Sequence, residues 1–137
     1  MIKVMKSRTV SVSIAIAPDL VYEFASNPEN FPQWAPNFCN SIEFVDGTWV
    51  VHSPDGPAIL EFVENNRFGV LDHTVTLESG LKFYNPMRIV PNGSGSEVLF
   101  TLFQPSNMDD GKFNEDAKLV ESDLRTLKRV IESLFGE

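Results

Sequence analysis

The sequence predicts an α+β fold in which a curved antiparallel sheet of seven strands packs against one long C-terminal helix. Three observations support this prediction. The chain opens with an alternating strand pattern followed by two short helical segments, its middle alternates short apolar runs with hairpin turns, and its end is a long amphipathic stretch. With 137 residues and 42% hydrophobic composition, residues 1–137 are expected to form a single domain.

The first strand is predicted at residues 9–16. Val10, Val12 and Ile14 alternate with serines, and this period of two indicates a strand with one buried face.

Two short helices are predicted after this strand. Pro18 suits the first position of a helix and Asp19 is favourable in its first turn. Pro28 ends that helix, and Asn27 can cap a second one that stops before Pro36.

Six strands are predicted in the middle of the chain, joined as an antiparallel meander. The turns between them contain Asp46-Gly47, Asp55-Gly56, Ser79-Gly80 and Asn92-Gly93, which are typical of hairpins. The predicted strands are 40–46, 48–53, 58–65, 69–78, 81–90 and 96–104.

The last element is a helix predicted at residues 112–135, with Gly136 as its stop. An apolar stripe at helical spacing should face the sheet and consists of Ala117, Val120, Leu124, Leu127, Ile131 and Leu134. Charged side chains are expected on the solvent side, namely Glu121, Asp123, Arg125, Lys128 and Glu132.

Segments 17–24 (APDLVYEF) and 27–34 (NPENFPQW) resemble the opening of the START/Bet v 1-like (SRPBCC) superfamily, which includes polyketide cyclase/dehydrase-like proteins. Segment 87–98 (MRIVPNGSGSEV) resembles bacterial members. The resemblance covers the whole chain and implies the helix-grip fold, with a cavity between sheet and C-terminal helix that binds lipids, polyketides or aromatic metabolites. Members include carriers, sensors, cyclases and chaperone co-activators, and a homodimer is left open.

Composition argues against several classes of partner. The formal charge of −8 disfavours nucleic acid and anionic membranes, and no stretch approaches the roughly 18 apolar residues of a membrane span. Two histidines cannot form a three-histidine zinc site, and no dinucleotide fingerprint is present, so neither a metal nor a cofactor is expected. Cys39 is the single cysteine, which favours a reducing cytoplasm and a buried, inert thiol.

His73 is the strongest polar candidate because strand alternation places it on the inward, apolar face with Leu71. A three-residue turn at 78–80, with its glycine in the left-handed conformation, would set Asn85 opposite His73. This pair could orient a ligand oxygen or shuttle a proton, or Asn85 could simply satisfy a core histidine.

A second register of this hairpin stays open. A two-residue Ser79-Gly80 turn would set Pro86 opposite His73 and bring Tyr84 and Arg88 to its face, where they could recognise an anion.

Eleven phenylalanines provide abundant apolar surface, most of it expected in the core. The face of Trp49 is ambiguous, and Glu43, Glu61 and Glu64 are expected to face water. The residues expected to contact a ligand are His73, Asn85, Trp34, Phe38, Phe62, Phe83, Met87, Phe100, Met108 and Leu124, with Tyr84 and Arg88 as the alternative cluster.

Three functions follow as hypotheses. The first is binding of a small, largely apolar or aromatic molecule, such as a lipid or polyketide-like metabolite. The second is a cyclase, dehydratase or isomerase in which His73 is the general acid or base. The third is a protein-interaction module of the chaperone co-activator type.

Overall fold

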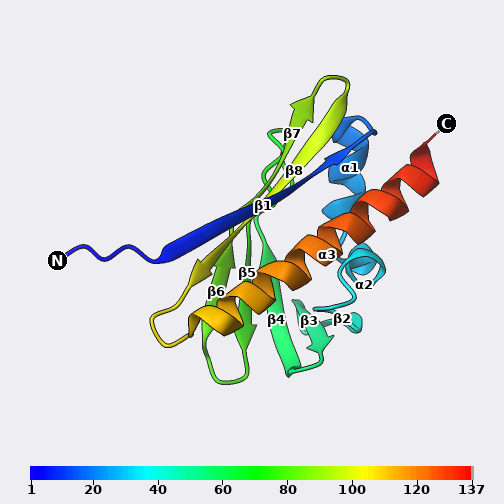
Figure 1. Cartoon of the computed structure of the whole chain (residues 1–137). Helices are drawn as coiled ribbons and strands as arrows, with labels where there is room; N and C mark the ends of the chain where they lie inside the picture. The colour runs from blue at the N-terminus through cyan, green and yellow to red at the C-terminus, as the bar shows by residue number, and fades with distance from the viewer. Residues whose placement is uncertain (137) are drawn as a thin grey trace.

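The computed structural model describes residues 1–136 and shows a curved antiparallel β-structure crossed by one long helix (Figure 1). Residues 1–5 precede the first strand and project from the body. The elements in chain order are β1 (Lys6–Ile14), α1 (Pro18–Ala25), η1 (Pro28–Asn30), α2 (Phe31–Trp34), β2 (Ser41–Val45), β3 (Thr48–Ser53), β4 (Gly56–Phe62), β5 (His73–Leu77), β6 (Lys82–Asn85), β7 (Met87–Asn92), β8 (Gly95–Gln104) and α3 (Asp110–Phe135).

The strands form two hydrogen-bonded sheets, so the prediction of one seven-stranded sheet was wrong. A three-stranded sheet has the order β1-β8-β7 and a five-stranded sheet has the order β2-β3-β4-β5-β6. The eighth strand arises because the predicted strand 81–90 is divided into β6 and β7. The α+β class, the antiparallel pairing and the long C-terminal helix are confirmed.

Pro86 explains this division, because proline has no N–H to donate to a neighbouring strand. Before Pro86 the chain pairs with β5, and after it the chain pairs with β8. The Pro86 carbonyl already accepts the Thr101 N–H at 2.9 Å. The break therefore lets one stretch of chain serve both sheets and bend between them.

The hairpin of β5 and β6 has the three-residue turn, and its first predicted register is confirmed. His73 pairs with Asn85, the Leu77 N–H donates to the Leu81 carbonyl at 2.9 Å, and Gly80 has φ +89°. The alternative register with Tyr84 at the face of His73 was wrong, since Tyr84 pairs with Thr74 on the outer face. Glycine at position 80 permits the left-handed turn that selects this register.

The two short helices form as their local signals predict. Pro18 occupies the first turn of α1, and Asn27 caps η1 by accepting the Glu29 N–H at 3.1 Å. The chain continues directly from η1 into α2, which ends at Trp34. Both helical segments lie beside α3 (Figure 1).

Helix α3 closes the core and begins at a capping residue. Asp109 accepts the Lys112 N–H at 2.7 Å, and the Gly136 N–H donates to the Glu132 carbonyl at 2.9 Å. The predicted apolar stripe is buried at Ala117, Leu124, Leu127 and Ile131, whereas Leu134 is 58% exposed near the helix end. None of the helices in residues 1–136 combines the length and apolar character needed to cross a membrane.

Asp123 was expected on the solvent side of α3 but is only 5% exposed. The backbone N–H and the side-chain amide of Asn37 both donate to its Oδ1, at 3.3 and 3.0 Å. Helical periodicity misplaced Asp123 because the segment that follows α2 covers this part of the helix. Burial raises the pKa of Asp123 from 3.8 to about 6, against the hydrogen bonds from Asn37, which lower it.

This raised pKa predicts how stability depends on pH. A carboxyl with a higher pKa in the folded state stabilises the fold when protonated, so its contribution falls as pH rises from about 4 through about 6. We expect Asp123→Asn to be more stable than the parent by about 2 kcal/mol at neutral pH, with no difference below about pH 4. Urea unfolding of both proteins at several pH values measures this difference, and a constant difference would contradict the prediction.

Candidate functional site

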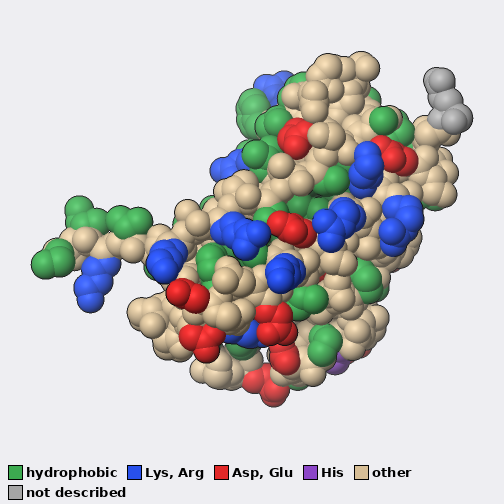
Figure 2. Space-filling view, viewed as in Figure 1, with side chains coloured by type: hydrophobic (Ala, Val, Ile, Leu, Met, Phe, Trp, Pro, Cys, Tyr) green, Lys and Arg blue, Asp and Glu red, His purple; other side chains and the backbone are tan. Residues whose placement is uncertain are grey.

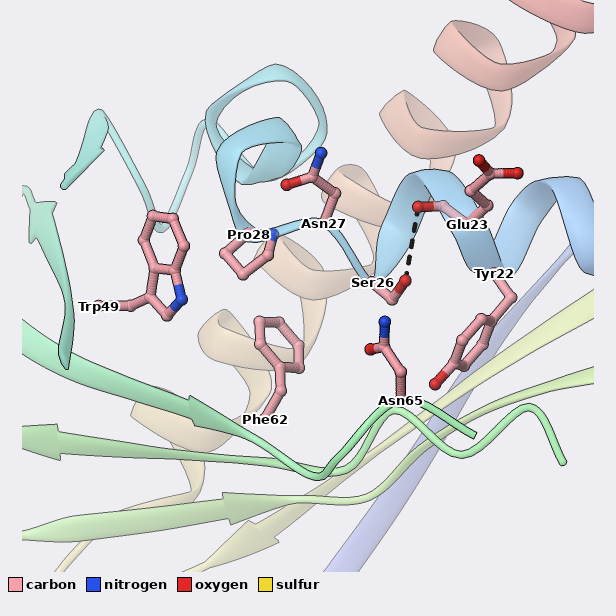
Figure 3. Close-up of a pocket in the computed structure, with 8 residues that line it drawn as sticks. All are labelled: Tyr22, Glu23, Ser26, Asn27, Pro28, Trp49, Phe62 and Asn65. Atoms are coloured by element: carbon pink, nitrogen blue, oxygen red, sulfur yellow. Dashed lines mark hydrogen bonds between the residues drawn. The ribbon is translucent and has the colours of Figure 1, made fainter. Parts of the chain in front are cut away.

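A pocket of about 500 Å³ opens between α1 and the inner side of β3 and β4 (Figure 3). We call it the α1–β4 pocket. Its lining residues are Tyr22, Glu23, Ser26, Asn27, Pro28, Trp49, Phe62 and Asn65. None of these lining residues belongs to α3. The resemblance implied a cavity between the sheet and the C-terminal helix, and the α1–β4 pocket lies elsewhere.

Aromatic rings form much of the pocket wall. Alternation along β4 turns Ala58, Leu60 and Phe62 inward, and Phe62 is the last residue of the strand. Trp49 lies opposite Leu60 on β3 and therefore shares the inward face, and its ring packs on Phe44 with centroids 5.0 Å apart. Figure 3 shows the Trp49 and Phe62 rings rising toward Pro28 from the sheet side.

Tyr22 anchors the loop that forms the other end of the pocket. Its hydroxyl accepts the Asn66 N–H at 3.0 Å and donates to the Val70 carbonyl at 3.4 Å. The Asn66 side chain in turn accepts the N–H groups of Phe68 and Val70 and donates to the Val70 carbonyl. These bonds fix the loop between β4 and β5, so Asn65 is held at the pocket.

The pocket also carries polar groups that a ligand could use. The side-chain amide of Asn65 makes no hydrogen bond within residues 1–136, and it points toward Ser26 (Figure 3). The Ser26 hydroxyl donates to the Glu23 carbonyl at 3.4 Å, which leaves its oxygen lone pairs free. The Glu23 carboxylate points away from Phe62 and from the other side chains drawn around the pocket (Figure 3).

His73 lies behind the pocket wall and does not line the pocket. It is 3% exposed, and its ring lies between Phe62 and Phe100 at centroid distances of 5.2 and 5.4 Å. Its Nδ1 is 3.0 Å from the Leu71 carbonyl, which identifies Nδ1 as the protonated nitrogen. Burial lowers the pKa of His73, so the ring is held in its neutral form.

The other predicted contact residues are distributed through the core. Trp34, Met87, Phe100 and Leu124 are buried, and the indole Nε1 of Trp34 has no hydrogen-bond partner among the described residues. Phe38, Phe83, Asn85 and Met108 are partly buried. Only Phe62 of the predicted set lines the α1–β4 pocket, and Trp49, whose face was ambiguous, joins it.

Tyr84 and Arg88 meet at Asp72, not at His73. Asp72 is 5% exposed and accepts hydrogen bonds from the Tyr84 hydroxyl at 2.8 Å, the Met87 N–H at 2.9 Å and the Arg88 guanidinium at 2.8 Å. The hydrogen bond to Asp72 is the main cause that raises the pKa of Tyr84. Sequence reasoning grouped Tyr84 and Arg88 only as an alternative cluster at His73 and did not identify Asp72 as their partner. The Asp72 cluster joins the start of β5 to the β6–β7 break.

Cys39 and the acidic side chains are the remaining candidates for reactive or metal-binding groups. Cys39 is fully buried, as expected, and burial raises the pKa of its thiol to about 11. Within residues 1–136 there is no group of three or more His, Cys, Asp or Glu side chains arranged to hold a metal ion.

No protein-family model and no curated protein matches this chain. Solved structures do match it. The protein XoxI from Bacillus cereus has a TM-score of 0.77 at 19% identity, covering 95% of this chain and 98% of that one. A START superfamily protein from Mycobacterium smegmatis gives 0.72 at 15%, covering 93% and 98%. The Aha1 dimer from Colwellia psychrerythraea gives 0.72 at 16%, covering 97% and 99%.

These similarities extend over nearly the full length of each chain, and they define the class of fold. The chain has the START/Bet v 1-like fold that segments 17–24 and 27–34 indicated. At these identities the comparisons concern architecture, and the chemistry of the site has to come from its own residues.

Proposed function

We propose that this protein binds a small, largely apolar or aromatic molecule, such as a lipid or polyketide-like metabolite, in the α1–β4 pocket. The observation that carries the proposal is a pocket of about 500 Å³ with Tyr22, Trp49 and Phe62 in its wall. Apolar pockets with a few convergent polar groups are the usual form of small-molecule sites. Ser26 and Asn65 would orient the ligand.

Binding is a better-supported function than acid–base catalysis at His73. The His73 ring is separated from the pocket by Phe62, which contacts both. A general base must come within hydrogen-bonding reach of its substrate, and a ligand in the pocket would meet Phe62 first. We therefore place His73 in the wall behind the site.

The proposal is tested with N-phenylnaphthylamine, an uncharged probe whose fluorescence rises in an apolar environment. We expect the parent protein to bind it with micromolar affinity. Ser26→Phe places a ring inside the pocket, so we expect the affinity to fall at least about tenfold, equivalent to about 1.4 kcal/mol.

Ser106→Phe is the matched control, because Ser106 is exposed in the turn before α3 and adds the same ring away from the pocket. Circular dichroism checks that both variants are folded. Absence of probe binding by the parent protein, or equal binding by Ser26→Phe and the control, would contradict the proposed function.

A further inference from the structure

Charge is distributed unevenly along the chain. Between Arg8 and Arg67 there is no lysine or arginine, although this stretch provides α1, η1, α2 and β2 to β4. The same stretch contains eight acidic residues, which are Asp19, Glu23, Glu29, Glu43, Asp46, Asp55, Glu61 and Glu64. The walls of the α1–β4 pocket therefore come almost entirely from a part of the chain that carries only negative formal charge at neutral pH.

Basic side chains gather elsewhere. Figure 2, viewed from the side of α3, shows lysines and arginines over that helix and the beginning of β1. The basic residue nearest to the pocket in sequence is Arg67, and its guanidinium lies over the Phe68 ring at 5.8 Å from the centroid. None of the residues that line the pocket is basic.

Three acidic residues belong to the pocket lining or adjoin it in sequence. Glu23 is a lining residue, Glu29 follows the lining residue Pro28, and Glu64 precedes the lining residue Asn65. All three are exposed, and within residues 1–136 none of them forms an ion pair. A rim with uncompensated negative charge attracts cations and repels anions, and the effect weakens as salt is added.

The aromatic wall also favours a positively charged ligand. The faces of tryptophan, tyrosine and phenylalanine rings carry negative electrostatic potential and attract cations, with tryptophan the strongest. Trp49, Phe62 and Tyr22 all border the pocket, and none of the lining residues is basic.

From these observations we infer that the ligand of the α1–β4 pocket is an organic cation, an apolar or aromatic body that carries an ammonium or similar group. The apolar body would pack on Phe62 and Trp49, and the charged group would lie toward the open side of the pocket, within the negative field of this acidic part of the chain. This inference rests on the proposed binding function and adds the charge class of the ligand.

Three naphthalene derivatives of similar size test the inference by isothermal titration calorimetry. They are naphthylmethyl-trimethylammonium, the neutral naphthylmethanol and the anionic naphthylacetate. We expect the cation to bind about tenfold more tightly than the neutral compound, and the anion more weakly than both. The ratio of the cation's affinity to the anion's affinity should decrease in high salt.

Variants separate the rim from the wall. Glu23→Gln, Glu29→Gln and Glu64→Gln together should remove the salt-sensitive part of the preference for the cation over the anion. The control combines Asp55→Asn, Glu78→Gln and Glu115→Gln, which make the same change in net charge at exposed positions that neither line the pocket nor adjoin its lining in sequence. Trp49→Leu should reduce the preference for the cation over the neutral compound that persists in high salt.

The outcomes distinguish this inference from the proposed function. Equal binding of the three compounds, or tightest binding of the anion, overturns the charge class and leaves the binding function in place. Failure of all three to bind at millimolar concentration overturns both. A control triple that loses as much preference as the rim triple also overturns the inference, because net charge alone would then explain it.

Discussion

Replacing Asp72 with alanine is expected to lower the free energy of unfolding by about 3 kcal/mol. The substitution removes three hydrogen bonds and leaves the Met87 N–H without a partner, where an unsatisfied buried donor costs about 1–3 kcal/mol. Arg88 and Tyr84 are 43% and 51% exposed, so water would compensate for part of their loss. Urea unfolding at neutral pH measures the change.

Variants of the partners check that the cluster is the cause. Tyr84→Phe removes one hydrogen bond from an exposed group and should cost about 1 kcal/mol or less. In Asp72→Asn the pKa of Tyr84 should fall back toward its ordinary value, because the carboxylate bond that raises it is lost. A loss of stability below about 1 kcal/mol in Asp72→Ala would show that the cluster does not hold β5 to the β6–β7 break.

Gly69→Ala is the second substitution with a large expected effect. Gly69 has φ +75°, and a β-carbon at this position would overlap the Ile89 carbonyl oxygen, which belongs to the backbone of β7. The left-handed conformation and the clash together should cost about 3 kcal/mol or more. Because Gly69 lies in the same loop as Asn65, we also expect weaker binding of N-phenylnaphthylamine.

Gly80→Ala is the matched control for this prediction. Gly80 has φ +89°, but nothing lies within 4 Å of the position that its β-carbon would take. It should therefore lose only about 1 kcal/mol, the cost of the backbone conformation. Equal losses in the two variants, measured by thermal and urea unfolding, would contradict a specific contact between Gly69 and β7.

Asp72→Ala and Gly69→Ala both change segment 63–72, which connects β4 to β5. It pairs with β7 through the Leu71 N–H and the Gly69 carbonyl, and it reaches α1 through Tyr22. The stability of this segment and the shape of the pocket are therefore coupled. A variant that loosens the segment should show reduced binding even where the aromatic wall is intact.

Local signals predicted most of the elements because each depends on neighbouring residues. Strand β3 and the end of α3 fall at the predicted positions, and Gly80 selected the register that pairs His73 with Asn85. The predictions were less accurate where one residue has two partners. Pro86 ends one pairing and begins another, and a period of two cannot show that change.

The candidate site was predicted only in part. Alternation placed Phe62 and His73 on the inward face correctly, but it gave no information on depth. Whether Phe62 borders a pocket while His73 lies behind it depends on where α1 meets the end of β4. The position of α1 relative to β4 is set by contacts between segments that are far apart in sequence.

The sequence by itself determined the order of the elements, the START/Bet v 1-like architecture, the inward face of the strands and the absence of basic residues between Arg8 and Arg67. The tertiary structure alone decided that Asp72 accepts hydrogen bonds from Tyr84 and Arg88, that Asp123 is buried under Asn37, and that the pocket lies at α1 rather than under α3. The physical reason is that periodicity specifies a direction for each side chain. What it meets in that direction depends on the curvature of the sheets and on long-range packing.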